Sequence, residues 1–172
     1  SKTASMTTRE VTEFWYNLFP WLGKSLDQVE SEVVDHVAKL ISVEGTPMEG
    51  VKEILDFFHN KGFKIGLSTN APSRLIPVVL ERLNIAHYFH ATSSSEDEIK
   101  GKPDPAVYLS TAKKLNVEPS KCIAFEDSIS GVISARKANM KTVVVPPFLE
   151  FSDEKYEISS IKLRQLSEFS DA

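Results

Sequence analysis

Residues 122–128 read Cys-Ile-Ala-Phe-Glu-Asp-Ser, and this stretch decides the fold of the chain. Its first part is a short apolar run of the kind that forms a buried strand. Glu126 and Asp127 follow directly, and residues 131–140 then have the pattern of a helix. A second run, over 142–145, is almost entirely β-branched and ends at two prolines. Strand, helix and strand in this order predict parallel strands joined by a helical crossover.

The same alternation of helix and strand extends upstream. Apolar residues at helical spacing over 51–58 predict a helix, and Gly62 suits the left-handed position that ends it. Asp104 before Pro105 predicts another helix start, because aspartate caps a helix and proline suits its first position. Three more elements are predicted: strands over 63–67 and 89–92, and a helix over 74–83. The fold class is therefore α/β, with a parallel sheet covered by helices on both faces.

The first part of the chain is predicted to be helical. Ser25 and Gln28 form a capping box at the start of a helix over 26–41, and a shorter helix over 11–19 stops at a proline. The composition changes at 43–47, which divides the chain into residues 1–45 and residues 46–172. The last segment is polar and is expected to dock through four apolar side chains, Ile161, Leu163, Leu166 and Phe169.

Composition excludes several classes of protein. The 172 residues are 41% hydrophobic and 26% charged, which is typical of a globular domain. The net charge of −4 gives no support to nucleic-acid binding through a basic surface, and no apolar run is long enough to span a membrane. Cys122 is the single cysteine, so no internal disulfide or cysteine-rich zinc site forms. A reducing, cytoplasmic setting is expected.

Polar residues follow the apolar runs at three points, and the carboxyl ends of parallel strands share one edge of a sheet. Thr69-Asn70 offers a hydroxyl and backbone amides for phosphate oxygens. Lys102 supplies positive charge, and Glu126-Asp127 supplies the hard oxygen ligands that Mg²⁺ prefers. Each piece alone has a structural interpretation, as a turn, a solvated charge or a helix cap. Their order and placement together indicate a phosphate-binding site.

Together these pieces resemble known motifs. Thr69-Asn70, Lys102-Pro103-Asp104-Pro105 and Phe125-Glu126-Asp127-Ser128 look like the second, third and fourth motifs of the haloacid dehalogenase superfamily. Within it, the chain resembles the branch that holds β-phosphoglucomutase and the sugar-phosphate phosphatases. The pairs Trp15-Tyr16 and Pro20-Trp21 are similar to pairs in the cap of 2-deoxyglucose-6-phosphate and hexitol phosphatases.

The resemblance implies a Rossmann-like core with a helical cap, of which residues 1–45 would be a part. It implies Mg²⁺ as cofactor and an aspartyl-phosphate intermediate. Thr69 would bind the transferring phosphoryl group, Asn70 would donate to it, and Lys102 would neutralise nucleophile and phosphate. Glu126 and Asp127 would hold the metal directly or through water, with Asp127 the more important of the two.

One motif of the superfamily is missing. The nucleophile and the general acid/base belong to an Asp-x-Asp-Gly motif on the first strand, and the sequence contains no Asp-x-Asp. In the family this strand lies between the strands that end here at Thr69 and Glu126. A fragment of a longer protein, a natural truncation and a second chain that supplies the strand are the alternatives. Residues 1–172 alone are expected to be inactive and not a stable monomer, because two apolar strands would lack ladder partners.

The intact protein is predicted to be a monomeric, Mg²⁺-dependent phosphohydrolase acting on a small sugar or polyol monophosphate. Its expected partner is this phosphorylated small molecule, and neither a nucleic acid nor a membrane is expected as a partner. The alternatives are a hexose-phosphate mutase of the β-phosphoglucomutase type and a catalytically silent phosphate-binding module. Pro72-Ser73 stand where the mutases carry a lysine and an asparagine that grip the far phosphate, which favours the phosphatase.

Overall fold

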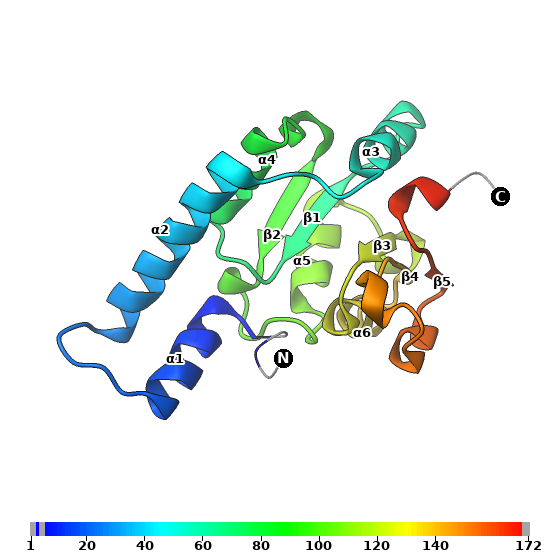
Figure 1. Ribbon diagram of the computed structural model, residues 1–172. Helices are drawn as coiled ribbons and strands as arrows, with labels where there is room; N and C mark the ends of the chain where they lie inside the picture. The colour runs from blue at the N-terminus through cyan, green and yellow to red at the C-terminus, as the bar shows by residue number, and fades with distance from the viewer. Residues whose placement is uncertain (1–2, 4–5, 170–172) are drawn as a thin grey trace.

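The computed structural model describes Thr3 and residues 6–169. Five parallel-paired strands form its centre, and they lie in two groups (Figure 1). The first group is β1 (Gly66–Thr69) with β2 (Ala91–Ser94), and the second is β3 (Ile123–Glu126), β4 (Lys141–Val144) and β5 (Ile161–Lys162). The predicted α/β fold with parallel strands is confirmed.

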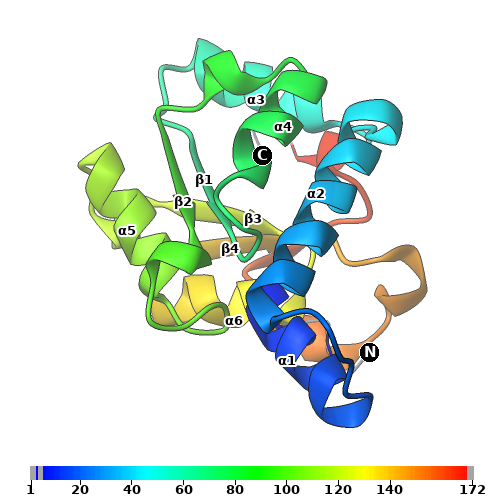
Figure 2. The same cartoon turned by 90° about the vertical axis from the view of Figure 1, so that its left-hand side faces the viewer.

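Helices cover both faces of these strands. Figure 2 shows α3 (Val51–Asn60) and α4 (Leu75–Arg82) on one side and α5 (Ala106–Leu115) and α6 (Ile129–Lys137) on the other. On the α3 and α4 side, buried Leu55, Ile76 and Leu80 form one apolar cluster with Ile85 and Tyr88. On the other side, α5 and α6 bury Val107, Tyr108 and Ala135 against Ala124 of β3. The chain therefore folds as a three-layer α/β/α structure.

Local signals in the sequence set the ends of these helices. Gly62 has a φ of +75° just after α3, as predicted from its lack of a side chain. Asn84, Asn116 and Asn139 follow α4, α5 and α6 with positive φ, the backbone region that asparagine tolerates best after glycine. Helix α5 begins one residue later than predicted, at Ala106, with Pro105 as its N-cap and no side-chain cap. Asp104 instead accepts a hydrogen bond from the Ala106 backbone N–H at 3.0 Å, in the turn before the helix.

Two helices lie beside the α/β part, α1 (Thr8–Leu18) and α2 (Leu26–Glu44). The predicted capping box of Ser25 and Gln28 is present at the start of α2. Arg74 donates to the Ser31 carbonyl at 2.7 Å, and Arg82 donates to the Gly45 carbonyl at 3.0 Å. These two arginines fasten α2 to α4. No helix in the described part of the chain is both long and apolar enough to cross a bilayer.

Several predicted boundaries differ from the observed ones. The strands predicted over 63–67 and 89–92 begin three and two residues later, because their pairing starts at Gly66 and Ala91. The Phe63 backbone N–H still donates to the Phe58 carbonyl of α3, at 3.0 Å. Helix α6 begins at Ile129, two residues before the predicted start, where the Ser128 hydroxyl accepts from Gly131 N–H and caps it. Strand β5 was not predicted, since its segment is polar.

The sheet is divided between β1 and β3. In the described residues no strand pairs with the facing edges of these two strands. Aromatic rings gather at one side of the division, where Phe58, Phe125 and Phe169 lie with ring centroids 5.1–5.6 Å apart. This division lies at the place that the sequence analysis expects for the first-motif strand.

Candidate functional site

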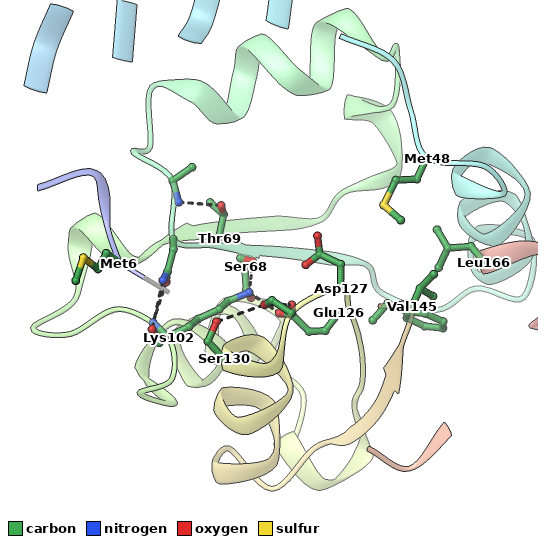
Figure 3. Close-up of a pocket in the computed structure, with 14 residues that line it drawn as sticks. Met6, Met48, Ser68, Thr69, Lys102, Glu126, Asp127, Ser130, Val145 and Leu166 are labelled. Carbon is green, nitrogen blue, oxygen red and sulfur yellow. Dashed lines mark hydrogen bonds and ion pairs between the residues drawn. The ribbon is translucent and has the colours of Figure 1, made fainter. Parts of the chain in front are cut away.

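A pocket of about 480 Å³ opens at the carboxyl ends of β1 and β3 (Figure 3). It contains all five residues that the sequence singled out: Thr69, Asn70, Lys102, Glu126 and Asp127. They come from three separate parts of the chain, and the parallel strands bring them together because they end at the same edge. The predicted convergence of these residues is therefore correct. Their roles in binding and catalysis remain predictions.

Lys102 connects the two groups of strands. Its Nζ donates to the Ser68 carbonyl of β1 at 3.0 Å and to Glu126 Oε1 of β3 at 2.5 Å. The side chains of Lys102 and Glu126 are only 10% and 7% exposed, so the ion pair is largely shielded from water. These bonds use two of the three N–H groups of the ammonium, and the third is left for a ligand oxygen.

The Glu126 carboxylate is enclosed on several sides. Tyr108 of α5 donates its hydroxyl hydrogen to the same Oε1 atom that Lys102 binds. Burial raises the pKa of Tyr108 well above its ordinary value, and the charge on Glu126 adds to this shift, so the hydroxyl keeps its proton. A Cβ atom at Gly131 would lie 2.0 Å from the Glu126 carboxyl carbon. Only glycine leaves room for the carboxylate here.

Thr69 is the last residue of β1, and its hydroxyl faces the pocket (Figure 3). The Thr69 Oγ1 atom accepts a hydrogen bond from the Ala71 backbone N–H at 3.0 Å. Its own hydrogen can still be donated, since accepting this bond does not consume the O–H group. Thr69 is thus oriented to donate to an anionic oxygen in the pocket.

The side-chain amide of Asn70 is bonded to other residues of the pocket. Its Oδ1 accepts from the Ser95 hydroxyl at 2.6 Å and from the Lys102 backbone N–H at 2.8 Å. Its Nδ2 donates to the Lys102 carbonyl at 3.4 Å. The amide therefore joins the segments that carry Asn70, Ser95 and Lys102. These bonds hold the backbone of Lys102 beside β1.

Asp127 points into the open part of the pocket, whereas Glu126 points toward Lys102 (Figure 3). Asp127 is exposed, so its carboxylate can bind a hydrated cation. The described residues contain no group of three or more histidine, cysteine or acidic side chains able to hold a metal. This donor set fits Mg²⁺, which takes one or two carboxylates together with water and phosphate oxygens. Asp127 is the carboxylate available to such a cation, because Glu126 is paired with Lys102.

Tyr108, Ser95 and the Ser68 carbonyl were not predicted as parts of the site. Tyr108 lies six residues after Lys102, and it is buried on α5. Nothing in the local pattern shows that its hydroxyl reaches Glu126. Ser95 lies just after a strand end, a position that the same strand-end reasoning could have identified.

Comparison with known proteins agrees with this geometry. Hexitol phosphatase B of Escherichia coli O157:H7 is 32% identical over 158 residues, which are 92% of this chain and 71% of that protein. The β-phosphoglucomutase of Bacillus subtilis strain 168 is 38% identical over 98 residues, or 57% of this chain and 42% of that protein. The crystal structure of a β-phosphoglucomutase from Clostridium difficile has a TM-score of 0.80 and 22% identity, covering 99% of this chain and 76% of that one. This last likeness shows the fold.

A protein-family match covers the part of the chain that contains the site. Residues 7–139 match the haloacid dehalogenase-like hydrolases. The match includes every helix from α1 to α6 and all five of the predicted site residues. The chain therefore belongs to the haloacid dehalogenase-like hydrolase family.

Proposed function

We propose that the intact protein is a Mg²⁺-dependent phosphohydrolase that removes phosphate from a small sugar or polyol monophosphate. The observation that carries this proposal is the pocket at the sheet division, where Lys102, Thr69 and Asp127 surround one space. An ammonium, a hydroxyl and a free carboxylate are the groups that a phosphate ester with a bound cation requires. The similarity to hexitol phosphatase B supports the substrate class.

Each residue has a role that follows from its contacts. Lys102 would place one N–H group on a phosphoryl oxygen while Ser68 and Glu126 hold the other two. Thr69 would donate its hydroxyl hydrogen to a second oxygen. Asp127 would bind Mg²⁺, which neutralises the charge of the phosphoryl group when it is bound. Such fixed charges supply most of the rate in phosphoryl transfer, because they need no rearrangement during the reaction.

The attacking group comes from outside the described residues in this proposal. None of the carboxylates in the pocket suits the role, since Glu126 is bonded to Lys102 and Asp127 is the cation ligand. The division between β1 and β3 lies beside the pocket, and no described strand pairs with either of the two edges that face it. We propose that this strand carries the nucleophile and that α1 and α2 form part of the cap over it.

The surroundings of Ser73 favour a phosphatase over a mutase. The backbone N–H and hydroxyl of Ser73 both donate to the Glu96 carboxylate, at 2.9 and 2.5 Å. Arg74 is turned toward α2, where it binds the Ser31 carbonyl and Asp35. A negative charge therefore stands where a mutase needs a cation for its second phosphate. A bisphosphate would be repelled there.

The test is an assay of the product of the complete coding sequence that contains this chain. We expect Mg²⁺-dependent release of phosphate from hexose and hexitol monophosphates, abolished by EDTA and restored by Mg²⁺. The same samples are checked for interconversion of glucose 1-phosphate and glucose 6-phosphate. Interconversion without net phosphate release would establish a mutase instead, and no turnover of any ester would support the silent module.

A further inference from the structure

We propose that Tyr108 is a positioning residue that fixes the Glu126 carboxylate on Lys102. Glu126 then serves as the anchor of the lysine, and the cation is left to Asp127. The inference deepens the proposed function and rests on it for the identity of the ligands, phosphate and a divalent cation. It assigns to Glu126 a role different from that of its neighbour in sequence, although the two stand side by side on the same strand end.

Tyr108 contacts both Glu126 and Lys102. The residue lies in the first turn of α5, is 7% exposed, and donates its hydroxyl hydrogen to Glu126 Oε1. Its ring also lies beneath Lys102, with Nζ 4.8 Å from the ring centroid. One side chain therefore contacts both members of the ion pair. It fixes the carboxylate through the hydroxyl and the ammonium through the ring face.

The residues around Glu126 restrict the position of its carboxylate. Gly131 of α6 lies directly behind the carboxylate, where a Cβ atom would come within 2.0 Å. The Ser128 hydroxyl lies 3.4 Å from Oε2, and the whole side chain is only 7% exposed. To turn toward Asp127 and bind a cation, Glu126 would have to give up its bonds to both Lys102 and Tyr108. No hydrogen bond or ion pair from another described residue holds the carboxylate of Asp127, which is exposed.

Loss of the Tyr108 hydroxyl should therefore move two affinities in opposite directions. The Tyr108→Phe variant keeps the ring beneath Lys102 but removes one of the two donors on Oε1. Lys102 is then held less firmly, so binding of phosphate weakens. Glu126 is freed to turn toward the open pocket as a second carboxylate ligand, so binding of a divalent cation strengthens. If Tyr108 only stabilised the fold, its replacement would not change the phosphate affinity and the cation affinity in opposite directions.

The experiment measures inorganic phosphate by calorimetry and Mn²⁺ by electron paramagnetic resonance in the intact protein. For Tyr108→Phe we expect phosphate affinity to fall about five- to tenfold, the effect of one hydrogen bond, and Mn²⁺ affinity to rise at least twofold. Tyr88→Phe is the matched control, because Tyr88 is also buried and also donates to a carboxylate, Asp56, away from the pocket. It should leave both affinities unchanged.

Two further variants test the proposal if Tyr108→Phe does not fold. Glu126→Gln should weaken phosphate binding and leave Mn²⁺ binding unchanged, whereas Asp127→Asn should abolish Mn²⁺ binding. An equal loss of Mn²⁺ in the Glu126 and Asp127 variants would overturn the proposal. So would unchanged affinities in a folded Tyr108→Phe protein, or a wild-type protein that binds neither ion. Absence of turnover would reject the proposed phosphohydrolase alone, because none of these measurements depends on hydrolysis.

Discussion

The side-chain amide of Asn70 and the backbone of Lys102 are bonded in both directions. The Lys102 N–H donates to Asn70 Oδ1 at 2.8 Å, and Asn70 Nδ2 donates to the Lys102 carbonyl at 3.4 Å. The Ser95 hydroxyl also donates to Oδ1, at 2.6 Å. The loop after β1 is thereby tied to the loop that carries the lysine. The position of Lys102 in the pocket depends on this amide as well as on the partners of its ammonium.

We expect Asn70→Ala to lower both stability and phosphate affinity. The substitution leaves the Ser95 hydroxyl and the Lys102 N–H without their shared acceptor, which costs about 1–3 kcal/mol in the free energy of unfolding. Urea denaturation measures the stability, and calorimetry measures phosphate binding. Asn60→Ala, at the exposed end of α3, is the control and should change neither. Unaltered phosphate affinity in Asn70→Ala would show that Lys102 keeps its position without the amide.

Gly131→Ala should destabilise the protein through a collision with Glu126. The new methyl group would overlap the carboxylate, and overpacking of this kind costs about 1–3 kcal/mol. Combining it with Glu126→Ala removes the atoms that collide. A double-mutant cycle in urea should therefore show that Gly131→Ala costs much less in the Glu126→Ala background. Equal costs in both backgrounds would place the strain elsewhere in α6.

Asp127→Asn should reduce turnover by the intact protein by about 100-fold or more at every Mg²⁺ concentration. The neutral amide keeps the shape of the side chain but loses the charge that attracts the cation. Initial rates across a Mg²⁺ series measure this effect. Asp97→Asn, an exposed acidic residue at the same edge of the strands, should behave like the wild type. Full recovery of the Asp127 variant at high Mg²⁺ would contradict its proposed place as the main ligand.

The bond between Ser73 and Glu96 should make stability depend on pH in the acid range. The Ser73 hydroxyl and backbone N–H lower the pKa of Glu96 below its ordinary value of 4.5. A depressed pKa means that the stabilisation is complete above about pH 4.5 and is lost as the pH falls through the lower, folded value. Urea midpoints for wild type and Glu96→Gln should therefore differ at pH 6 and converge under acid conditions. A difference that stays constant with pH would argue against this linkage.

A polypeptide of residues 1–172 alone should release no phosphate from sugar phosphates. The sequence has no Asp-x-Asp pair, and among the described residues no basic side chain is hydrogen-bonded to the Thr69 hydroxyl to activate it as a nucleophile. The Asp104 carboxylate is engaged in the turn before α5, where it accepts from the Ala106 backbone N–H. A colorimetric phosphate assay with Mg²⁺ checks this, with the product of the complete coding sequence as the positive control. Release that disappears in an Asp127→Ala variant would reveal a nucleophile within these residues.

Much of the fold could be predicted because its signals are local. The apolar runs that became β1 to β4 were identified within about three residues, and the capping box at Ser25 set the start of α2. Strand β5 was missed, because only two residues pair and their segment looks polar. Strand ends were imprecise for a related reason. Hydrogen bonding to a neighbouring strand fixes where a strand begins, and that neighbour is distant in the sequence.

By itself, the sequence determined which groups meet in the pocket. Thr69, Lys102 and Asp127 each follow a strand or precede a helix, and parallel strands end at one edge, so their convergence follows from order alone. Only the tertiary structure decided which way the Glu126 and Asp127 carboxylates point. The hydroxyl of Tyr108 and the empty side of Gly131 direct Glu126 to Lys102 and leave Asp127 to the solvent. Those contacts arise from the packing of α5 and α6 on β3, which no local pattern encodes.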